Sequence, residues 1–176
     1  KKIQKTDVLH GETRQDDYFW LREKSDPEVI KYLESENAYT AAMLKPTEKL
    51  QEDLYKEMLG RIKETDLSVP YREGGYFYYS RTEQGKQYSI HCRKKGSLDA
   101  PEEVTIDLNE VARGHSFLSL SEYEVSDDGK LLAYALDFTG FRQYTMFVKN
   151  LATGQTLSEK IERVDSVAWA NDNKTL

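Results

Sequence analysis

The sequence predicts a mixed α and β fold: an N-terminal arm and helical pair, followed by antiparallel four-stranded blades of an incomplete β-propeller. Three observations lead to this fold class. Apolar residues recur at helical spacing through the first third of the chain, and from Val69 the spacing changes to two, which is typical of strands. A short motif then recurs 44 residues further on, an interval that fits one propeller blade.

The composition is that of a soluble protein that folds compactly. Hydrophobic residues make up 38% of the 176, and 31 acidic against 25 basic side chains give a net charge of −6, which argues against a nucleic-acid partner. The longest apolar run, Leu131–Leu136, is far shorter than the ~20 residues of a membrane helix. A single cysteine, Cys92, excludes an intrachain disulfide framework and a Cys-rich zinc site. We therefore expect a cytoplasmic protein without a membrane or nucleic-acid partner.

Two helices are predicted behind the N-terminal arm. Ser25-Asp26-Pro27-Glu28 combines a capping side chain, a proline in the first turn and a glutamate placed as in a capping box. Lys45-Pro46 should end this first helix, because proline disfavours the helical state of the residue before it. The second helix is predicted from apolar residues that recur every four positions: Leu50, Leu54, Met58 and Ile62.

Short strands are predicted after the helices, separated by turns that contain glycine. The first pair flanks the turn Glu83–Lys86, and later turns lie at Asp127–Lys130, Thr139-Gly140 and Ala152–Gly154. The predicted strands are Tyr76–Arg81, Gln87–Arg93, Glu122–Ser126, Leu131–Asp137, Tyr144–Asn150 and Thr156–Lys160.

The repeated motif indicates stacked blades. Val125–Leu132 aligns with Trp169–Leu176, and a looser copy, Glu73–Tyr79, matches Asp128–Tyr134. A blade cannot cover both of its own faces, so neighbouring blades must bury its apolar side chains. Two blades and part of a third cannot close a ring, and the chain does not begin with Met, so we expect a fragment of a longer protein.

The residues show no recognisable catalytic motif. Gly114-His115-Ser116-Phe117-Leu118 lacks the second glycine of a nucleophile elbow. His10, His91 and His115 lie too far apart for a helix-borne metal site, and no bidentate Glu follows Asp127-Asp128-Gly129 where a calcium loop needs one. We assign no catalytic residue, no metal ligand and no cofactor.

Four features leave a structural and a functional interpretation open. The aromatic run Tyr76–Tyr79 is expected to pack between neighbouring sheets; the alternative is a surface that stacks on sugars or bases. The cluster Tyr18–Leu21 should dock on a partner surface. Arg93-Lys94-Lys95 is a solvated strand end or touches an anion. His91 and Cys92 should point to opposite faces of one strand, one into the core and the other exposed.

Several longer segments resemble the N-terminal region of the prolyl oligopeptidase family of serine peptidases, most closely its oligopeptidase B branch. They are Asp16–Arg22, Asp26–Ile30, Glu36–Tyr39, Arg61–Pro70 and Gly75–Tyr88. The resemblance implies a cytoplasmic enzyme that cleaves short peptides, after Lys or Arg in this branch, in which a seven-bladed propeller caps an α/β-hydrolase domain and restricts access to it.

This resemblance implies a division of labour along the chain. Residues 1–66 would pack on the C-terminal α/β-hydrolase domain, and residues 67–176 would form the first blades of the propeller. The catalytic triad would lie beyond Leu176, so we expect the 176 residues alone to be inactive. The alternative is a free-standing module that binds a protein or peptide through open β edges.

Overall fold

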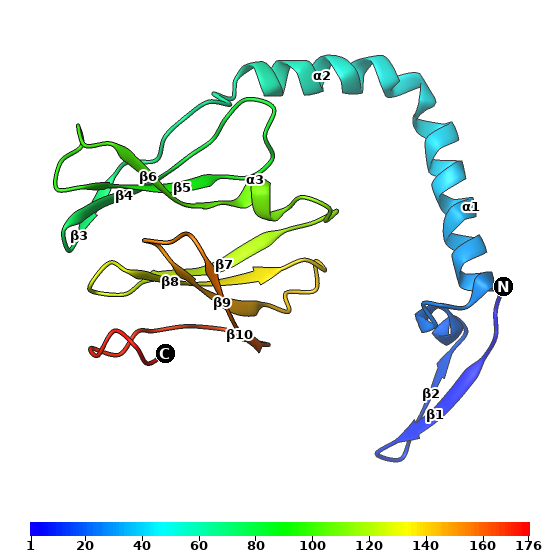
Figure 1. The fold of residues 1–176 in the computed structure, drawn as a ribbon. Coiled ribbons are helices and arrows are strands. Elements are labelled where there is room, and N and C mark those ends of the chain that lie inside the picture. Colours follow the sequence, from blue (N-terminus) through cyan, green and yellow to red (C-terminus); the bar gives the residue numbers. More distant parts are fainter. The chain divides into compact units, whose positions relative to one another are not determined.

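The computed structural model describes all 176 residues and divides them into two compact units, Lys1–Ile62 and Lys63–Leu176 (Figure 1). The first unit consists of a β-hairpin and two helices, and the second contains two four-stranded antiparallel sheets. The predicted fold class is thereby confirmed. No helix in the chain has both the length and the hydrophobicity that crossing a membrane requires.

The arm of the first unit contains a hairpin that the sequence interpretation missed. Strand β1 (Lys5–Leu9) pairs with β2 (Glu12–Asp16) around His10 and Gly11, whose φ angles are 52° and 82°. Two consecutive residues with positive φ make the tight turn that matches the twist of a hairpin. A 3₁₀ turn, η1 (Phe19–Arg22), follows.

Helix α1 (Pro27–Leu44) ends where the Lys45-Pro46 signal predicts, but its cap differs from the expected one. Asp26 is the N-cap, and its carboxylate accepts a hydrogen bond of 2.8 Å from the backbone N–H of Glu28. The capping box that begins at Ser25 is therefore wrong, because Asp26 is already adjacent to Pro27 at the first helical position.

A 3₁₀ turn, η2 (Lys45–Thr47), leads into helix α2 (Glu48–Gly60). The helix stops before Ile62, which the apolar spacing had included. Arg61 and Ile62 donate their backbone N–H groups to the carbonyls three residues back, which tightens the last turn at a glycine with poor helix propensity.

The second unit begins with a four-stranded meander, the first sheet, in the order β3-β4-β5-β6. Its strands are β3 (Tyr71–Glu73), β4 (Tyr76–Arg81), β5 (Ile90–Lys95) and β6 (Glu102–Asp107). Strand β4 has its predicted bounds. Strand β5 starts three residues later than predicted, because the backbone N–H and C=O of Tyr88 are bonded to the side chain of Asn109 instead of a neighbouring strand.

Helix α3 (Leu108–Val111) connects this meander to the second sheet, whose strands run in the order β7-β8-β9-β10. They are β7 (Ser119–Val125), β8 (Leu131–Asp137), β9 (Thr145–Asn150) and β10 (Thr156–Glu162). Every strand of this sheet was predicted, although only β8 has its predicted bounds. Strands β3 and β6 and helix α3 were not predicted. In β6, a β-bulge opposite His91 and Cys92 leaves Thr105 without a pairing partner and disturbs the alternation of the strand.

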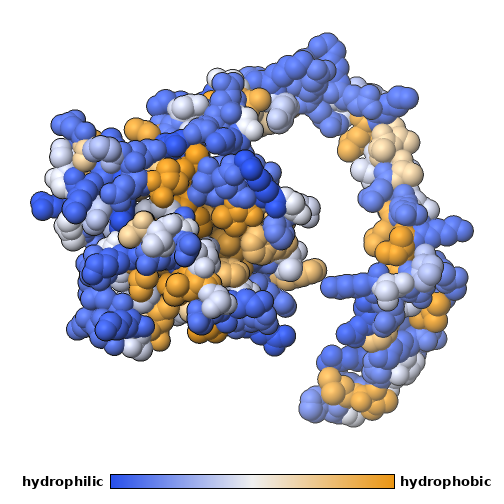
Figure 2. Space-filling model, in the orientation of Figure 1, coloured by the Kyte–Doolittle hydropathy of each residue, from blue (hydrophilic) through white to orange (hydrophobic).

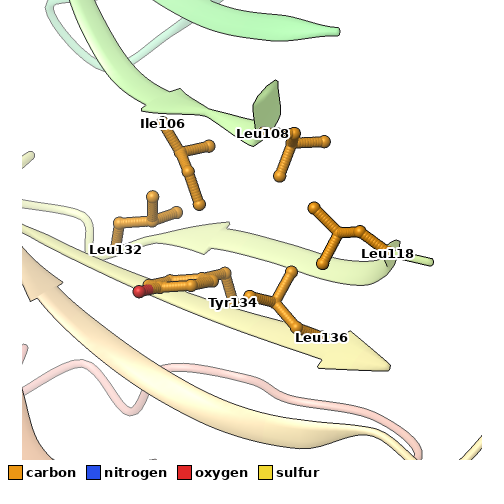
Figure 3. Packing of buried hydrophobic residues seen from close by; sticks show 6 residues of the cluster. All are labelled: Ile106, Leu108, Leu118, Leu132, Tyr134 and Leu136. Atoms are coloured by element: carbon orange, nitrogen blue, oxygen red, sulfur yellow. The ribbon is translucent and has the colours of Figure 1, made fainter. Parts of the chain in front are cut away.

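The main hydrophobic core lies between the two sheets (Figure 3). The first sheet and its helix contribute Ile106 and Leu108, and the second sheet contributes Leu132, Tyr134 and Leu136. Burying each large aliphatic side chain contributes roughly 1.5–3 kcal/mol, so the stacked sheets stabilise each other. The core thus has the position expected for stacked blades.

The third copy of the repeat, Trp169–Leu176, folds back on itself beside the second copy. Ala170 donates a backbone hydrogen bond of 2.9 Å to Thr175. The indole Nε1 of Trp169 donates to the carbonyl of Glu124, and the N–H of Asp128 donates to Asn173 Oδ1, at 2.9 and 3.0 Å. Successive copies therefore contact each other at their turns.

Gly129, in the turn between β7 and β8, lies against the first sheet. Its φ is 72°, and a Cβ there would be 3.0 Å from Cε2 of Tyr76. Gly154 has a similar φ of 74° but open space around the corresponding position. Substituting alanine at each glycine therefore distinguishes the cost of a positive φ, which both sites share, from the cost of a clash with the first sheet, which only Gly129 has.

We expect Gly129→Ala to destabilise the chain more than Gly154→Ala. A left-handed residue with a Cβ costs roughly 1–2 kcal/mol at either site, and overpacking against Tyr76 adds about 1 kcal/mol or more at residue 129 alone. Urea denaturation of both variants measures the difference in unfolding free energy. Equal losses would contradict a close contact between the two sheets at this turn.

Candidate functional site

The structure does not assemble the histidines and serine considered from the sequence into a catalytic site. His10 lies in the hairpin turn, His91 in β5, and His115 in the loop after α3, where its ring is 4.1 Å from that of Phe138. No hydrogen bond connects Ser116 to any histidine. The chain also gathers no set of three or more His, Cys, Asp or Glu side chains suited to a metal ion.

The residues that do come together form the seam, which we define as the polar contacts between the facing sides of the two sheets. Its members are Arg93, Thr105, Tyr123, Gly129 and Lys149. The aromatic run supplies one wall of it: Tyr76 lies under Arg93, and Tyr78 stacks on Tyr71 with ring centroids 5.7 Å apart. The interpretation in which these rings pack between the sheets fits Tyr76, whose ring lies against Gly129 of the second sheet.

Arg93 is the centre of the seam at the β7–β8 turn. Its guanidinium donates 2.6 Å to the carbonyl of Gly129, pairs with Glu103 at 2.8 Å, and lies 4.0 Å from the ring centroid of Tyr76. Burial by itself would lower the pKa of Arg93, but hydrogen bonds to Glu103 and Tyr78 raise it above its ordinary value. The side chain is 6% exposed, so a solvated strand end is wrong for this residue.

A second cation crosses the seam in the opposite direction. Lys149 on β9 donates 2.8 Å to the carbonyl of Thr105 on β6, and burial lowers the pKa of its ammonium group. Arg93 reaches from the first sheet to a carbonyl of the second, whereas Lys149 reaches from the second sheet to a carbonyl of the first. Two charge-assisted hydrogen bonds therefore fix the lateral position of one sheet on the other.

Between these two cations, a tyrosine and a threonine complete the seam. Thr105 Oγ1 donates a hydrogen bond of 3.0 Å to the carbonyl of His91. Because its single hydrogen is used there, Thr105 Oγ1 accepts the 2.6 Å hydrogen bond that it shares with the hydroxyl of Tyr123. Burial raises the pKa of Tyr123, which keeps the hydroxyl protonated. Neither Thr105 nor Tyr123 belongs to a sequence motif, and Lys149 looked like an ordinary strand residue; the sequence offered no signal for them.

A cleft of about 490 Å³ opens beside the seam, between the β3–β4 turn and the β7–β8 turn. The rings of Tyr76 and Tyr78 and the backbone of Gly74, Gly75 and Gly129 line it. At the corresponding place between the second and third copies of the repeat, the side chain of Asn173 accepts a hydrogen bond from the backbone N–H of Asp128. Gly129 is the residue 44 positions earlier and has no side chain that could make such a hydrogen bond.

Cys92 lies on the other side of the first sheet, in a small cluster with Tyr79 and Ile90. It is fully buried, and burial raises the pKa of its thiol to about 11, so the thiolate that a nucleophile requires is disfavoured. His91 and Cys92 do point to opposite sides of the strand. The expectation that one of them is exposed is wrong, because His91 is half-buried against Tyr123.

Comparison with known proteins identifies the source of this architecture. The model of the prolyl oligopeptidase N-terminal β-propeller domain matches residues 1–176. The chain belongs to this family. Its two four-stranded sheets are accordingly blades of a prolyl oligopeptidase propeller domain, and the seam is a contact between neighbouring blades.

Curated relatives agree with the family and are much longer than this chain. A dipeptidyl aminopeptidase BI from Pseudoxanthomonas mexicana is 40% identical over the whole chain, which covers 27% of that protein. A protease 2 from Moraxella lacunata is 38% identical over 96% of the chain and 26% of that protein. The chain therefore spans about a quarter of the length of these relatives.

Solved structures show the same arrangement of elements. Oligopeptidase B from Leishmania major matches with a TM-score of 0.80 and 33% identity, over 92% of this chain and 25% of that one. Oligopeptidase B from Trypanosoma brucei, with covalently bound antipain, matches with the same TM-score and 28% identity over equal shares. In both structures the similarity covers most of the 176 residues of this chain.

We expect Arg93→Met to cost about 3 kcal/mol of unfolding free energy, because it removes a buried charge-assisted bond to Gly129 together with the pair to Glu103. Glu103→Gln should cost less than about 1 kcal/mol, since that side chain is 46% exposed and the amide still accepts a hydrogen bond. Urea denaturation of both variants and of exposed Lys95→Met, as a control, measures this. A loss for Arg93→Met no larger than for Lys95→Met would refute the role of Arg93.

Proposed function

We propose that this chain is the N-terminal, propeller part of a serine oligopeptidase that hydrolyses short peptides after Lys or Arg. The observation that carries the proposal is the family match over all 176 residues, together with the similarity to a protease 2 and to oligopeptidase B structures. Preference for Lys or Arg is what the resemblance to the oligopeptidase B branch implies.

In this proposal the chain contributes no catalytic group. The polar side chains between the two sheets form the seam and not an acid–base pair. Hydrolysis is carried out by an α/β-hydrolase domain that contains the catalytic triad. The blades of the second unit restrict access to that domain, and residues 67–176 are the first of them.

Residues 1–66 dock on the hydrolase domain in the same proposal. Helices α1 and α2 leave many large apolar side chains in solvent, and within the first unit only Val29 is buried among them. Figure 2 shows apolar residues interspersed with hydrophilic ones along this unit. Leu54 and Met58 are 47% and 58% exposed on consecutive turns of one side of α2, a pattern that fits burial against another domain.

A binding module is the second candidate, and the open edge of β10 favours it. Strand β10 pairs only with β9, and its seven residues are all exposed. Such an edge can accept an additional strand from another chain. The two candidates differ in one measurable property, peptide hydrolysis by a single polypeptide that contains both this chain and the hydrolase domain. We call this polypeptide the joined protein.

The first experiment measures cleavage of chromogenic peptides by that joined protein. We expect hydrolysis of amino-blocked peptides that end in Lys or Arg, and much slower hydrolysis of the matched peptide that ends in Pro. The 176-residue chain alone should release no chromophore. Cleavage only of dipeptides with a free amino terminus, or a preference for Pro, would contradict the proposed specificity.

The second experiment tests docking through α2. Leu54→Asp combined with Met58→Asp should lower the melting temperature of the joined protein by several degrees, because charged groups would face the hydrolase domain. The same pair should change the unfolding free energy of the 176-residue chain by about 1 kcal/mol or less, since both side chains are exposed there. Lys56→Asp, on the opposite side of α2, is the control; equal effects in both proteins would argue against docking.

A further inference from the structure

One histidine, His91, lies beside the seam, in the contact between the two sheets. We call this contact, made by His91, Thr105 and Tyr123, the joint. His91 on β5 stacks on Tyr123 on β7, with ring centroids 4.8 Å apart and an interplanar angle of 25°. Thr105 connects the two residues, since its hydroxyl donates to the carbonyl of His91 and accepts from the hydroxyl of Tyr123. Any change in the imidazole therefore acts on the contact between the sheets.

The surroundings of His91 offer no partner for a positive charge. The ionisable groups on the facing sides of the strands around it are Tyr71 and Glu73 on β3, Tyr76 and Tyr78 on β4, Arg93 and Lys95 on β5, Glu103 on β6, Tyr123 on β7, Tyr134 on β8 and Lys149 on β9.

The set contains two carboxylates: Glu103 is paired with Arg93, and Glu73 lies opposite Tyr76, which pairs with Lys95, four residues along β5 from His91. Glu122 and Glu124 flank Tyr123 in β7, so they point to the other side of that strand. Both cations of the seam, Arg93 and Lys149, are bound to backbone carbonyls across it. An imidazolium would add a third positive charge to the joint without a counter-ion.

We propose that the joint between the first and second sheets is a pH-sensitive element, in which protonation of His91 loosens one sheet from the other. The half-buried imidazole is neutral in the closed joint and gains its proton where water reaches it. Loosening separates the His91–Tyr123 stack first, because the charge develops on that ring. This inference does not depend on the proposed peptidase activity.

Burial lowers the pKa of His91 in the folded chain below its ordinary value of about 6.5. The unfolded chain therefore binds the proton more tightly. Stability is complete above about pH 6.5, falls as the pH decreases from there to the lowered folded value, and becomes level below it. Each unit by which the folded pKa lies below the unfolded one corresponds to about a tenfold change in the unfolding constant.

His91→Phe tests the proposal, because phenylalanine keeps a ring against Tyr123 but cannot be protonated. The control is His115→Phe, which removes an exposed imidazole that also contacts an aromatic ring, that of Phe138. The unfolding constant in urea is measured at about pH 7.5 and about pH 5.5, on either side of the ordinary histidine value. Hydrogen exchange of the β5 and β7 amides at both values reports the joint itself.

We expect the natural chain and His115→Phe to become several-fold less stable at the lower pH, with β5 and β7 losing protection first, and His91→Phe to lose much of this dependence. The same pH dependence in His91→Phe would overturn the proposal, as would a loss of protection spread evenly over both sheets.

If His91→Phe fails to fold, NMR titration of the natural chain decides. A midpoint for His91 below the ordinary histidine value of about 6.5 supports the proposal, and a midpoint at or above that value overturns it.

Discussion

The stacking of one four-stranded sheet on the next is the contact on which the second unit depends. A single meander of this kind has two faces and can bury neither by itself, so its apolar side chains are stable only against a neighbour. Ile106 and Leu108 reach the core from the first sheet, and Leu132, Tyr134 and Leu136 complete it from the second. The connection through α3 brings these two groups together directly after β6.

Apolar contact is not directional, so it does not by itself determine how the two sheets align. The polar seam supplies that alignment. Arg93 and Lys149 cross it in opposite directions, each to a backbone carbonyl, and these carbonyls hold fixed positions in a turn and a strand. A shift of one sheet along the other would leave both cations desolvated without their acceptors, which costs more than the loss of an exposed ion pair.

The repeat explains both the regularity of this arrangement and its local exception. Trp169 in the third copy bonds to Glu124, directly before the second copy, and Asn173 bonds to Asp128 within it. The equivalent of Asn173 in the second copy is Gly129, which has no side chain to reach the first copy. Arg93 makes that connection from β5, and the cleft lined by Tyr76 and Tyr78 lies beside it.

Local patterns in the sequence were enough to predict the helical pair, the change to strands, the bounds of β4 and β8, and the repeat, because helix ends, turns and alternation depend on near neighbours. The N-cap at Asp26, the hairpin around His10 and the bulged strand β6 depend on small differences between competing local structures, and they were missed or misplaced. Only the tertiary structure decided the fates of Arg93, Lys149 and His91. Their partners lie on another sheet, 32 to 44 residues away in the chain, and no spacing within one strand indicates which carbonyl or ring will face them.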